Sequence, residues 1–214
     1  MRRLIIVILG LLLSAGVAFS QQDKKAKELL DKASAAFTKA GGLKASFSFT
    51  LENTKAKTNE TFIGSISMSG NKFLIETSDY TAWYNGVNQW VYMKANEEVN
   101  LSAPSPDETQ MINPATILTG YQKGFNYKYT GLKTLDGKKV DEIELIPQKK
   151  GEWKKLVIQL DQTNRLPVSL YLQNVNGMNN RVKIAKYQTN LQLPESTFTF
   201  NKSKFPNAEV IDLR

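Results

Sequence analysis

The first hydrophobic pattern with a regular spacing lies between residues 23 and 40. Its apolar positions recur every three or four residues and its lysines fall outside them, which predicts an amphipathic helix. The apolar stripe consists of Ala26, Leu29, Leu30, Ala33, Phe37 and Ala40. Gly41 and Gly42 follow directly, and they end the predicted helix because glycine adopts the left-handed backbone of a C-cap without steric cost.

After Gly42 the period of the pattern changes to two, which is the spacing of a half-buried β-strand. Every second residue from Leu43 to Leu51 is apolar, and the residues between them are polar. The dipeptides Asn85-Gly86 and Asp136-Gly137 are typical of tight turns between paired strands. Further strand-like runs cover residues 61–68, 73–77, 82–84, 89–92, 125–129, 140–146, 155–160, 168–173 and 181–187.

The alternation stops between residues 95 and 124, a segment that contains three prolines. Within it, Asn113 is a good helix N-cap, Pro114 suits the first helical position, and Gly120 can end a short helix. The sequence therefore predicts a second, short helical segment in the middle of a chain that otherwise forms strands.

Consecutive strands joined by short turns usually pair with each other. The pattern therefore predicts a mainly β fold, in which one large antiparallel sheet curls towards a barrel. One face of each strand is polar, so the apolar face needs a cover, and the two helical segments are available for it. We find no internal repeat and no sign of a second domain.

The N-terminus has the pattern of a secretory signal peptide. Arg2 and Arg3 precede an apolar run that is too short for a comfortable transmembrane helix. Ala18 and Ser20 are small residues at positions −3 and −1 of a cut before Gln21. We expect residues 1–20 to be removed and residues 21–214 to form a single exported domain that is soluble and monomeric. No cysteine follows the cut, so we expect no lipid anchor.

The composition excludes several kinds of chemistry. The chain has no Cys and no His, which rules out Ser-His-Asp and Cys-His catalysis and the usual zinc sites. The net charge of +8 becomes +6 without Arg2 and Arg3. The lysines are scattered, which is typical of a solvated surface, with weak attraction to an anionic membrane surface or an acidic partner as the functional alternative. Nothing indicates nucleic-acid binding.

The carboxylates do not predict an active site. Glu97 and Glu98, like Asp141 and Glu142, are adjacent on predicted strands, so their side chains point to opposite faces. Glu142 and Glu144 share a face, which the solvent-exposed side of a strand explains. The sequence has no phosphate-binding, dinucleotide-binding or calcium-binding motif. We therefore expect a protein that is not an enzyme and that needs no cofactor.

Large apolar side chains dominate the first half of the predicted sheet. They include Phe47, Phe49, Phe62, Phe73, Trp90, Tyr92 and Phe125. Periodicity alone leaves two interpretations open, an ordinary core and the lining of a cavity between sheet and helices.

The order of these segments resembles the LolA family of periplasmic lipoprotein carriers over nearly the whole mature chain. Residues 43–47 are similar to the opening strand of that family, and residues 64–77 to its next hairpin. Residues 84–86 and 89–92 are similar to the family hairpin in which an Asp-Gly turn precedes a tryptophan strand. Asn85 replaces the usual Asp, and both residues suit a turn.

The second half of the chain continues the resemblance. Residues 113–118 stand where the family has a short lid helix, and Phe198-Thr199-Phe200 with Pro206, Val210 and Ile211 matches its closing segment. One departure concerns the lid. The family often has an Arg-Pro pair whose arginine latches the lid, whereas this chain has Ser69 and Gly70 at those positions.

The resemblance implies an unclosed β-barrel whose concave apolar face is covered by the N-terminal helix and the lid. It implies a cavity for acyl chains lined by Phe47, Phe49, Phe62, Phe73, Ile75, Trp90 and Tyr92, and a lid that comprises Asn113, Pro114, Ile117 and Leu118. Trp90 has an alternative position on the outer side of the sheet under a loop. Without the arginine, we expect the lid to be held mainly by Ile117 and Leu118.

The same resemblance implies a cargo and two partners. Acylated lipoproteins would be received from a release complex of the inner membrane and delivered to an acceptor at the outer membrane. Two other classes remain open. One is a module on the same fold that senses lipids or lipopeptides, and the other is an outer-membrane barrel. The end at Leu213-Arg214, which lacks a terminal aromatic residue, and the amphipathic N-terminal helix speak against the barrel.

Overall fold

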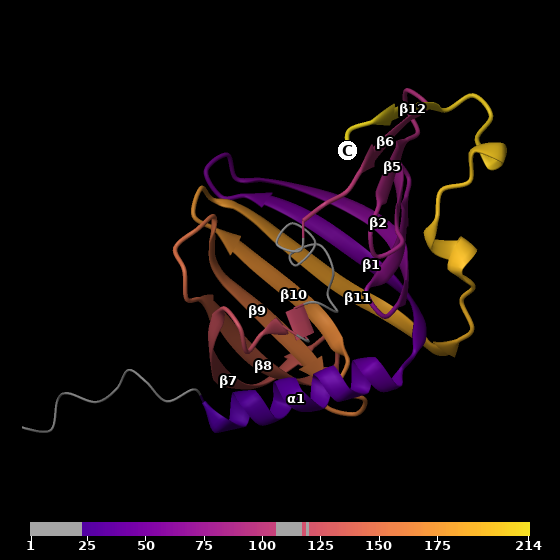
Figure 1. Cartoon of the computed structure of the whole chain (residues 1–214). Coiled ribbons are helices and arrows are strands. Elements are labelled where there is room, and N and C mark those ends of the chain that lie inside the picture. Colours follow the sequence, from indigo (N-terminus) through magenta and orange to yellow (C-terminus); the bar gives the residue numbers. More distant parts are fainter. Residues whose placement is uncertain (1–22, 106–116, 119) are drawn as a thin grey trace, which may run out of the picture.

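The computed structural model describes residues 23–105, 117–118 and 120–214 of the chain. The elements follow one another along the chain as shown in Figure 1. In the described residues they are α1 (Lys24–Lys39), β1 (Gly42–Asn53), β2 (Thr58–Ser69), β3 (Lys72–Thr77), β4 (Tyr80–Tyr84), β5 (Gln89–Met93), β6 (Glu98–Ser102), β7 (Phe125–Leu135), β8 (Lys138–Pro147), β9 (Trp153–Asp161), β10 (Pro167–Asn174), β11 (Met178–Leu191), the 3-10 helices η1 (Glu195–Phe198) and η2 (Lys202–Lys204), and β12 (Glu209–Asp212).

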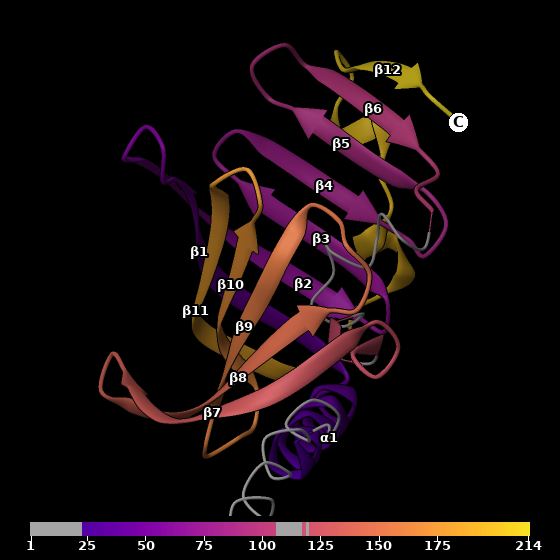
Figure 2. The same cartoon turned by 90° about the vertical axis from the view of Figure 1, so that its left-hand side faces the viewer.

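One large, open sheet contains the twelve strands of the described residues. Its order is β12-β6-β5-β4-β3-β2-β1-β11-β10-β9-β8-β7, so two meanders meet where β1 pairs with β11. Neighbouring strands are antiparallel apart from β12 and β6, which are parallel. Figure 2 shows how the sheet curves while β7 and β12 stay apart as its edges. The predicted mainly β fold with one curved, unclosed sheet is confirmed.

The helix α1 begins and ends where the sequence predicts. Asp23 is its N-cap, because its side chain accepts hydrogen bonds from the backbone N–H groups of Lys25 and Ala26 at 2.9 and 3.2 Å. Gly41 follows its end with a φ of +61°. Gly42 has another role, since a Cβ there would lie 2.1 Å from the carbonyl oxygen of Leu191 on β11. The second glycine therefore allows the close pairing of β1 with β11.

The inner face of the sheet is the face against which α1 packs. The helix lies across one end of the curved sheet in Figure 1, and its apolar stripe is buried there. Leu29 and Leu30 are each only 1% exposed and belong to the same hydrophobic cluster as Leu43 and Ala45 of β1. Burying such a side chain contributes about 1.5–3 kcal/mol, so this contact is a main source of stability.

The strand register aligns apolar residues in rows across the inner face. One row crosses seven strands from β7 to β2 without a polar residue. It consists of Tyr129, Ile143, Ile158, Leu170, Val182, Phe49 and Phe62.

The outer face of β3–β5 is covered by the segment that follows β11. Phe200 and Phe205 of this segment pack against Trp83 of β4, with ring centroids 5.5 and 5.6 Å apart. Lys72 of β3 forms an ion pair with Glu195 of η1. The segment then forms β12 beside β6 at the edge of the sheet.

Candidate functional site

The inner face changes from fully buried to half-buried along its strands. Next to α1, Leu43, Met68 and Phe73 are each at most 2% exposed. Farther along the strands, Phe47 and Val182 are only partly buried, although they still pack against the same hydrophobic cluster. The inner face therefore has a solid core at its helical end and accessible apolar side chains beyond it.

The accessible part of the inner face contains a pair of phenylalanines. Phe49 and Phe62 lie directly opposite each other on β1 and β2, with ring centroids 6.4 Å apart and both side chains half-buried. Phe47 precedes them on the same face of β1, opposite Gly64. A Cβ on Gly64 would lie 2.9 Å from Cζ of Phe47 and 2.6 Å from the carbonyl oxygen of Glu76. The glycine thus leaves room for the ring of Phe47 over β2.

Five of the predicted cavity residues share the inner face. Phe73 is part of the solid core, where its ring lies 5.3 Å from that of Tyr84. Ile75 is half-buried, pairs with Ala82 and packs against the same cluster. With the phenylalanines described above, the inner-face set is Phe47, Phe49, Phe62, Phe73 and Ile75. Their contact with acyl chains stays a prediction.

Trp90 and Tyr92 lie on the other face, so their assignment to the cavity is corrected. Trp90 pairs with Trp83, which is on the outer face, and the ring of Tyr92 lies 4.8 Å from that of Phe205. Val91 between them faces inward opposite Ala82. Apolar residues occupy both faces of β5, so alternation alone does not reveal which set faces inward.

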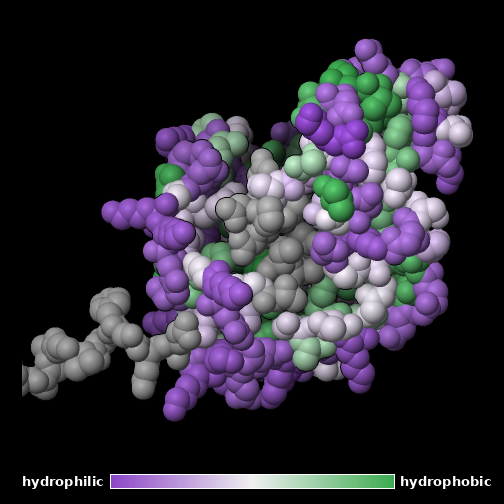
Figure 3. All heavy atoms as spheres, viewed as in Figure 1, coloured by the Kyte–Doolittle hydropathy of each residue, from purple (hydrophilic) through white to green (hydrophobic). Residues whose placement is uncertain are grey.

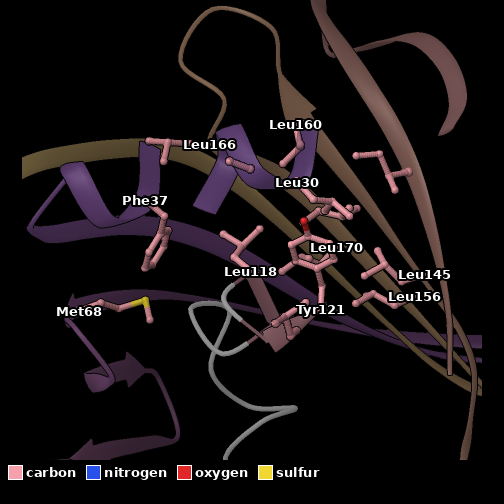
Figure 4. Packing of buried hydrophobic residues seen from close by; sticks show 14 of the residues in the cluster. Leu30, Phe37, Met68, Leu118, Tyr121, Leu145, Leu156, Leu160, Leu166 and Leu170 are labelled. Carbon is pink, nitrogen blue, oxygen red and sulfur yellow. The ribbon is translucent and has the colours of Figure 1, made fainter. Parts of the chain in front are cut away.

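The two predicted lid residues that the structure describes lie in the core. Ile117 and Leu118 are helical and are 3% and 1% exposed. Figure 4 shows Leu118 packed between the sheet and side chains of α1, including Leu30 and Phe37. Asn113 and Pro114 lie outside the described residues.

Sequence analysis missed Tyr121, which links this segment to α1. Its hydroxyl donates a 2.6 Å hydrogen bond to Oδ1 of Asp31, and its ring lies edge-on to Tyr127 at 5.2 Å. Burial and the bond to Asp31 raise the pKa of Tyr121 to about 12. The Asp31 pKa is lowered by hydrogen bonds from Lys27 and Tyr121. Tyr121 directly follows Gly120, the glycine predicted to end the short helix, and this spacing gives no signal that would predict the contact.

The carboxylates of β8 already have polar partners. Asp141 points to the inner side and is 3% exposed, and its Oδ2 lies 2.7 Å from Nη1 of Arg165. Tyr129 also donates to Asp141 at 2.9 Å. Glu144 on the outer side forms a 2.7 Å ion pair with Lys155. The predicted separation of Asp141 and Glu142 onto opposite faces is confirmed, whereas Glu97 lies in the turn before β6 and not on a strand.

The described residues, which exclude residues 1–22, 106–116 and 119, lack two further kinds of feature. They contain no group of three or more acidic residues that would hold a metal ion. They also contain no helix that is long and apolar enough to cross a membrane.

These features define a half-barrel protein with an apolar inner face and a helix across one end. The chain belongs to the family described as "Outer membrane lipoprotein carrier protein LolA", whose sequence model matches residues 16–169. The predicted family resemblance is confirmed.

Solved structures are similar to this chain at low sequence identity. An uncharacterized conserved protein from Thermus thermophilus has a TM-score of 0.60 and 11% identity, with 88% of this chain and 99% of that chain covered. The LolA superfamily protein NE2245 from Nitrosomonas europaea has a TM-score of 0.45 and 12% identity, with 82% and 97% covered.

One curated relative is similar in sequence over most of the chain. It is the uncharacterized protein MJ0687 from Methanocaldococcus jannaschii, which is 25% identical over 198 residues. The match covers 91% of this chain and 57% of that protein, so the chain spans little more than half the length of this relative.

Proposed function

We propose that this protein is a periplasmic carrier that binds the acyl chains of lipoproteins and ferries them from the inner to the outer membrane. The observation that supports this most directly is the half-buried apolar part of the inner face around Phe47, Phe49 and Phe62. Membership of the LolA family supports the same conclusion. In this proposal residues 1–20 are the cleaved signal peptide, and the mature protein is a monomer and not an enzyme.

An apolar face that is only partly buried suits acyl chains as a cargo that must be both shielded and released. Each CH₂ group removed from water contributes roughly 0.8 kcal/mol, so exposed acyl chains cannot cross an aqueous compartment unshielded. A membrane, however, shields the same chains from water as completely as a carrier does. A carrier must therefore bind them about as well as its donor and its acceptor do. Side chains such as Phe49 and Phe62 can shield a chain while leaving it free to depart.

The proposed cycle has a donor and an acceptor. A lipoprotein release complex of the inner membrane hands over the cargo, and an acceptor at the outer membrane, either a protein or the membrane itself, receives it. Ile117 and Leu118 close the helical end of the inner face, so the acyl chains bind beyond them. No cofactor takes part.

Purification from the periplasm followed by native mass spectrometry tests the proposal. We expect a bound triacylated peptide on the wild-type protein. The variant Phe62→Ser should lose most of this cargo, because it removes one ring of the phenylalanine pair. The matched control is Ile63→Ser on the same strand, since Ile63 is 75% exposed on the outer face. Equal cargo on the two variants, free phospholipid alone, or no ligand on the wild type would count against lipoprotein carriage.

A further inference from the structure

Three turns meet at one end of the sheet. They are residues 54–57 between β1 and β2, residues 148–152 between β8 and β9, and residues 174–178 between β10 and the start of β11. Backbone hydrogen bonds join them, from Thr54 to the carbonyl of Gly177 at 3.0 Å and from Val175 to that of Glu152 at 2.9 Å. We call these residues the three-turn rim, which lies on the left of Figure 1.

The three-turn rim is basic. Its lysines, all exposed, are Lys55, Lys57, Lys149 and Lys150. Its single carboxylate is Glu152. None of these lysines forms an ion pair with another residue in the described ranges. Their charge is therefore available to a partner outside the chain.

The rim also exposes apolar side chains among these lysines. Val175 is 65% exposed and Met178 is 38% exposed. The same edge of the molecule in Figure 3 carries mainly hydrophilic side chains with hydrophobic ones among them. Val87 in the β4–β5 turn is equally exposed at 67%, but its own turn, residues 85–88, has no lysine. The rim therefore differs from that turn because it combines exposed apolar side chains with lysines that form no ion pair in the described ranges.

One turn of the rim, residues 54–57, stands at the accessible end of the inner face. Leu51 of β1, two residues before the rim's neighbour Asn53, is half-buried, whereas Leu172 of β10, two residues before Asn174, is 7% exposed and belongs to the core. Phe49 lies two residues before Leu51, about 7 Å farther from the rim along the strand. A surface that touches the β1–β2 turn of the rim is therefore next to the part of the inner face that we propose for acyl chains.

We propose that the three-turn rim docks this protein onto an anionic phospholipid surface, an inference that rests on the proposed function for its purpose. Lysines near such a surface are attracted by its negative potential, and each strengthens binding by about fivefold. Val175 and Met178 insert at the boundary between headgroups and acyl chains, as apolar side chains of peripheral proteins do. Docking this way aligns the accessible end of the inner face with the membrane, so a chain moves between them without crossing water.

Flotation with lipid vesicles tests the docking. The mature protein is mixed with vesicles of phosphatidylcholine alone or of phosphatidylcholine with phosphatidylglycerol, at low and at high salt. We expect binding to the anionic vesicles only, and weaker binding at high salt because salt screens the attraction. Equal binding to both vesicle types, or no binding to either, would overturn the inference and leave the rim as a surface for a protein partner.

Variants locate the binding surface. Lys149→Gln with Lys150→Gln should weaken partitioning to anionic vesicles by about tenfold or more, and Val175→Ser should weaken it at both salt concentrations. The matched control is Lys138→Gln with Lys139→Gln, two exposed lysines at the start of β8. Equal losses in the two double variants would show that net charge alone attracts the protein, which overturns docking by the rim.

The vesicle assay and the cargo assay can each contradict one proposal without contradicting the other. The vesicles contain no lipoprotein, so anionic vesicle binding that depends on the rim supports docking even if purified protein carries no cargo. Conversely, a protein that carries triacylated peptide but ignores anionic vesicles overturns docking and leaves the proposed carrier function intact.

Discussion

At the scale of single residues, the absence of a side chain at Gly64 shapes the accessible inner face. The backbone of β2 approaches β3 and the ring of Phe47 so closely that a Cβ would have to displace one of them. Sequence alternation shows Gly64 on the same face as Phe62, but it does not show that the position is crowded. Glycine is disfavoured in strands, and the crowding around position 64 in the folded chain explains why it occurs here.

We expect Gly64→Ala to destabilise the protein by about 1–3 kcal/mol, since the added carbon overpacks a filled site. Urea unfolding followed by circular dichroism measures the change. Gly151→Ala is the matched control, because apart from its chain neighbours no heavy atom of the described residues lies within 4 Å of a Cβ there, and its effect should stay within about 0.5 kcal/mol. Equal unfolding midpoints for the two variants would show that the residues around position 64 accommodate the added Cβ without a loss of stability.

At the scale of elements, the long periodic segments were the most predictable. The stripe of α1 buries the residues that the helical spacing indicates, and the dipeptides at residues 85–86 and 136–137 lie in the turns that they predict. The face of β5 was not predictable, because Trp90 and Tyr92 alternate with Val91 and all three are apolar. Phe205, more than a hundred residues later, decides which set lies outside.

The contact between Tyr121 and Asp31 also joins elements that are far apart in sequence. Tyr121→Phe keeps the ring against Tyr127 and removes the hydrogen bond to Asp31, so we expect a loss of about 1 kcal/mol at neutral pH. Tyr92→Phe is the control, since its hydroxyl has no hydrogen bond within the described residues. Urea midpoints of both variants give the comparison.

The pH dependence of this contact follows from the two pKa shifts. The folded-state pKa of Tyr121 is raised from 10.0 to about 12, so its stabilisation is complete below pH 10 and is lost as the pH rises towards 12. The pKa of Asp31 is lowered from 3.8, so its stabilisation is present above that pH and is lost in acid. Wild type should therefore lose its advantage over Tyr121→Phe in acid. As the pH rises above 10 it should lose that advantage again and then become the less stable of the two, because only wild type must ionise a buried hydroxyl. A constant difference across the pH range would contradict this contact as the cause.

The segment that contains Leu118 can be tested for its role in cargo binding. Leu118→Glu places a carboxylate in the core, where its desolvation is unfavourable, so we expect the segment to leave the core. The sheet should keep its far-ultraviolet circular dichroism, while less lipoprotein co-purifies. Full cargo on a variant with the wild-type spectrum would show that this segment does not control the acyl-chain site.

At the scale of the whole molecule, one sheet serves two purposes on its two faces. Strands β3–β5 carry a packed aromatic cluster on the outer face, formed with the segment after β11, whereas the inner face continues into the accessible region around Phe49. Sheet edges and faces without cover invite unwanted association. The C-terminal segment covers the outer face of β3–β5 and leaves the inner face as an apolar surface available to a ligand.

This division predicts that stability and cargo binding can be separated by substitution. Phe205→Ala removes ring contacts with Trp83, Tyr92 and Phe200, so we expect a loss of about 2 kcal/mol with cargo retention unchanged. Phe49→Ser on the inner face should have the opposite profile, a small change in stability and a large loss of co-purified lipoprotein, because its ring is only half-buried. Urea unfolding and native mass spectrometry of both variants measure the two effects. If Phe205→Ala releases cargo as readily as Phe49→Ser, the two faces are coupled, and the accessible inner face does not bind acyl chains independently of the outer cluster.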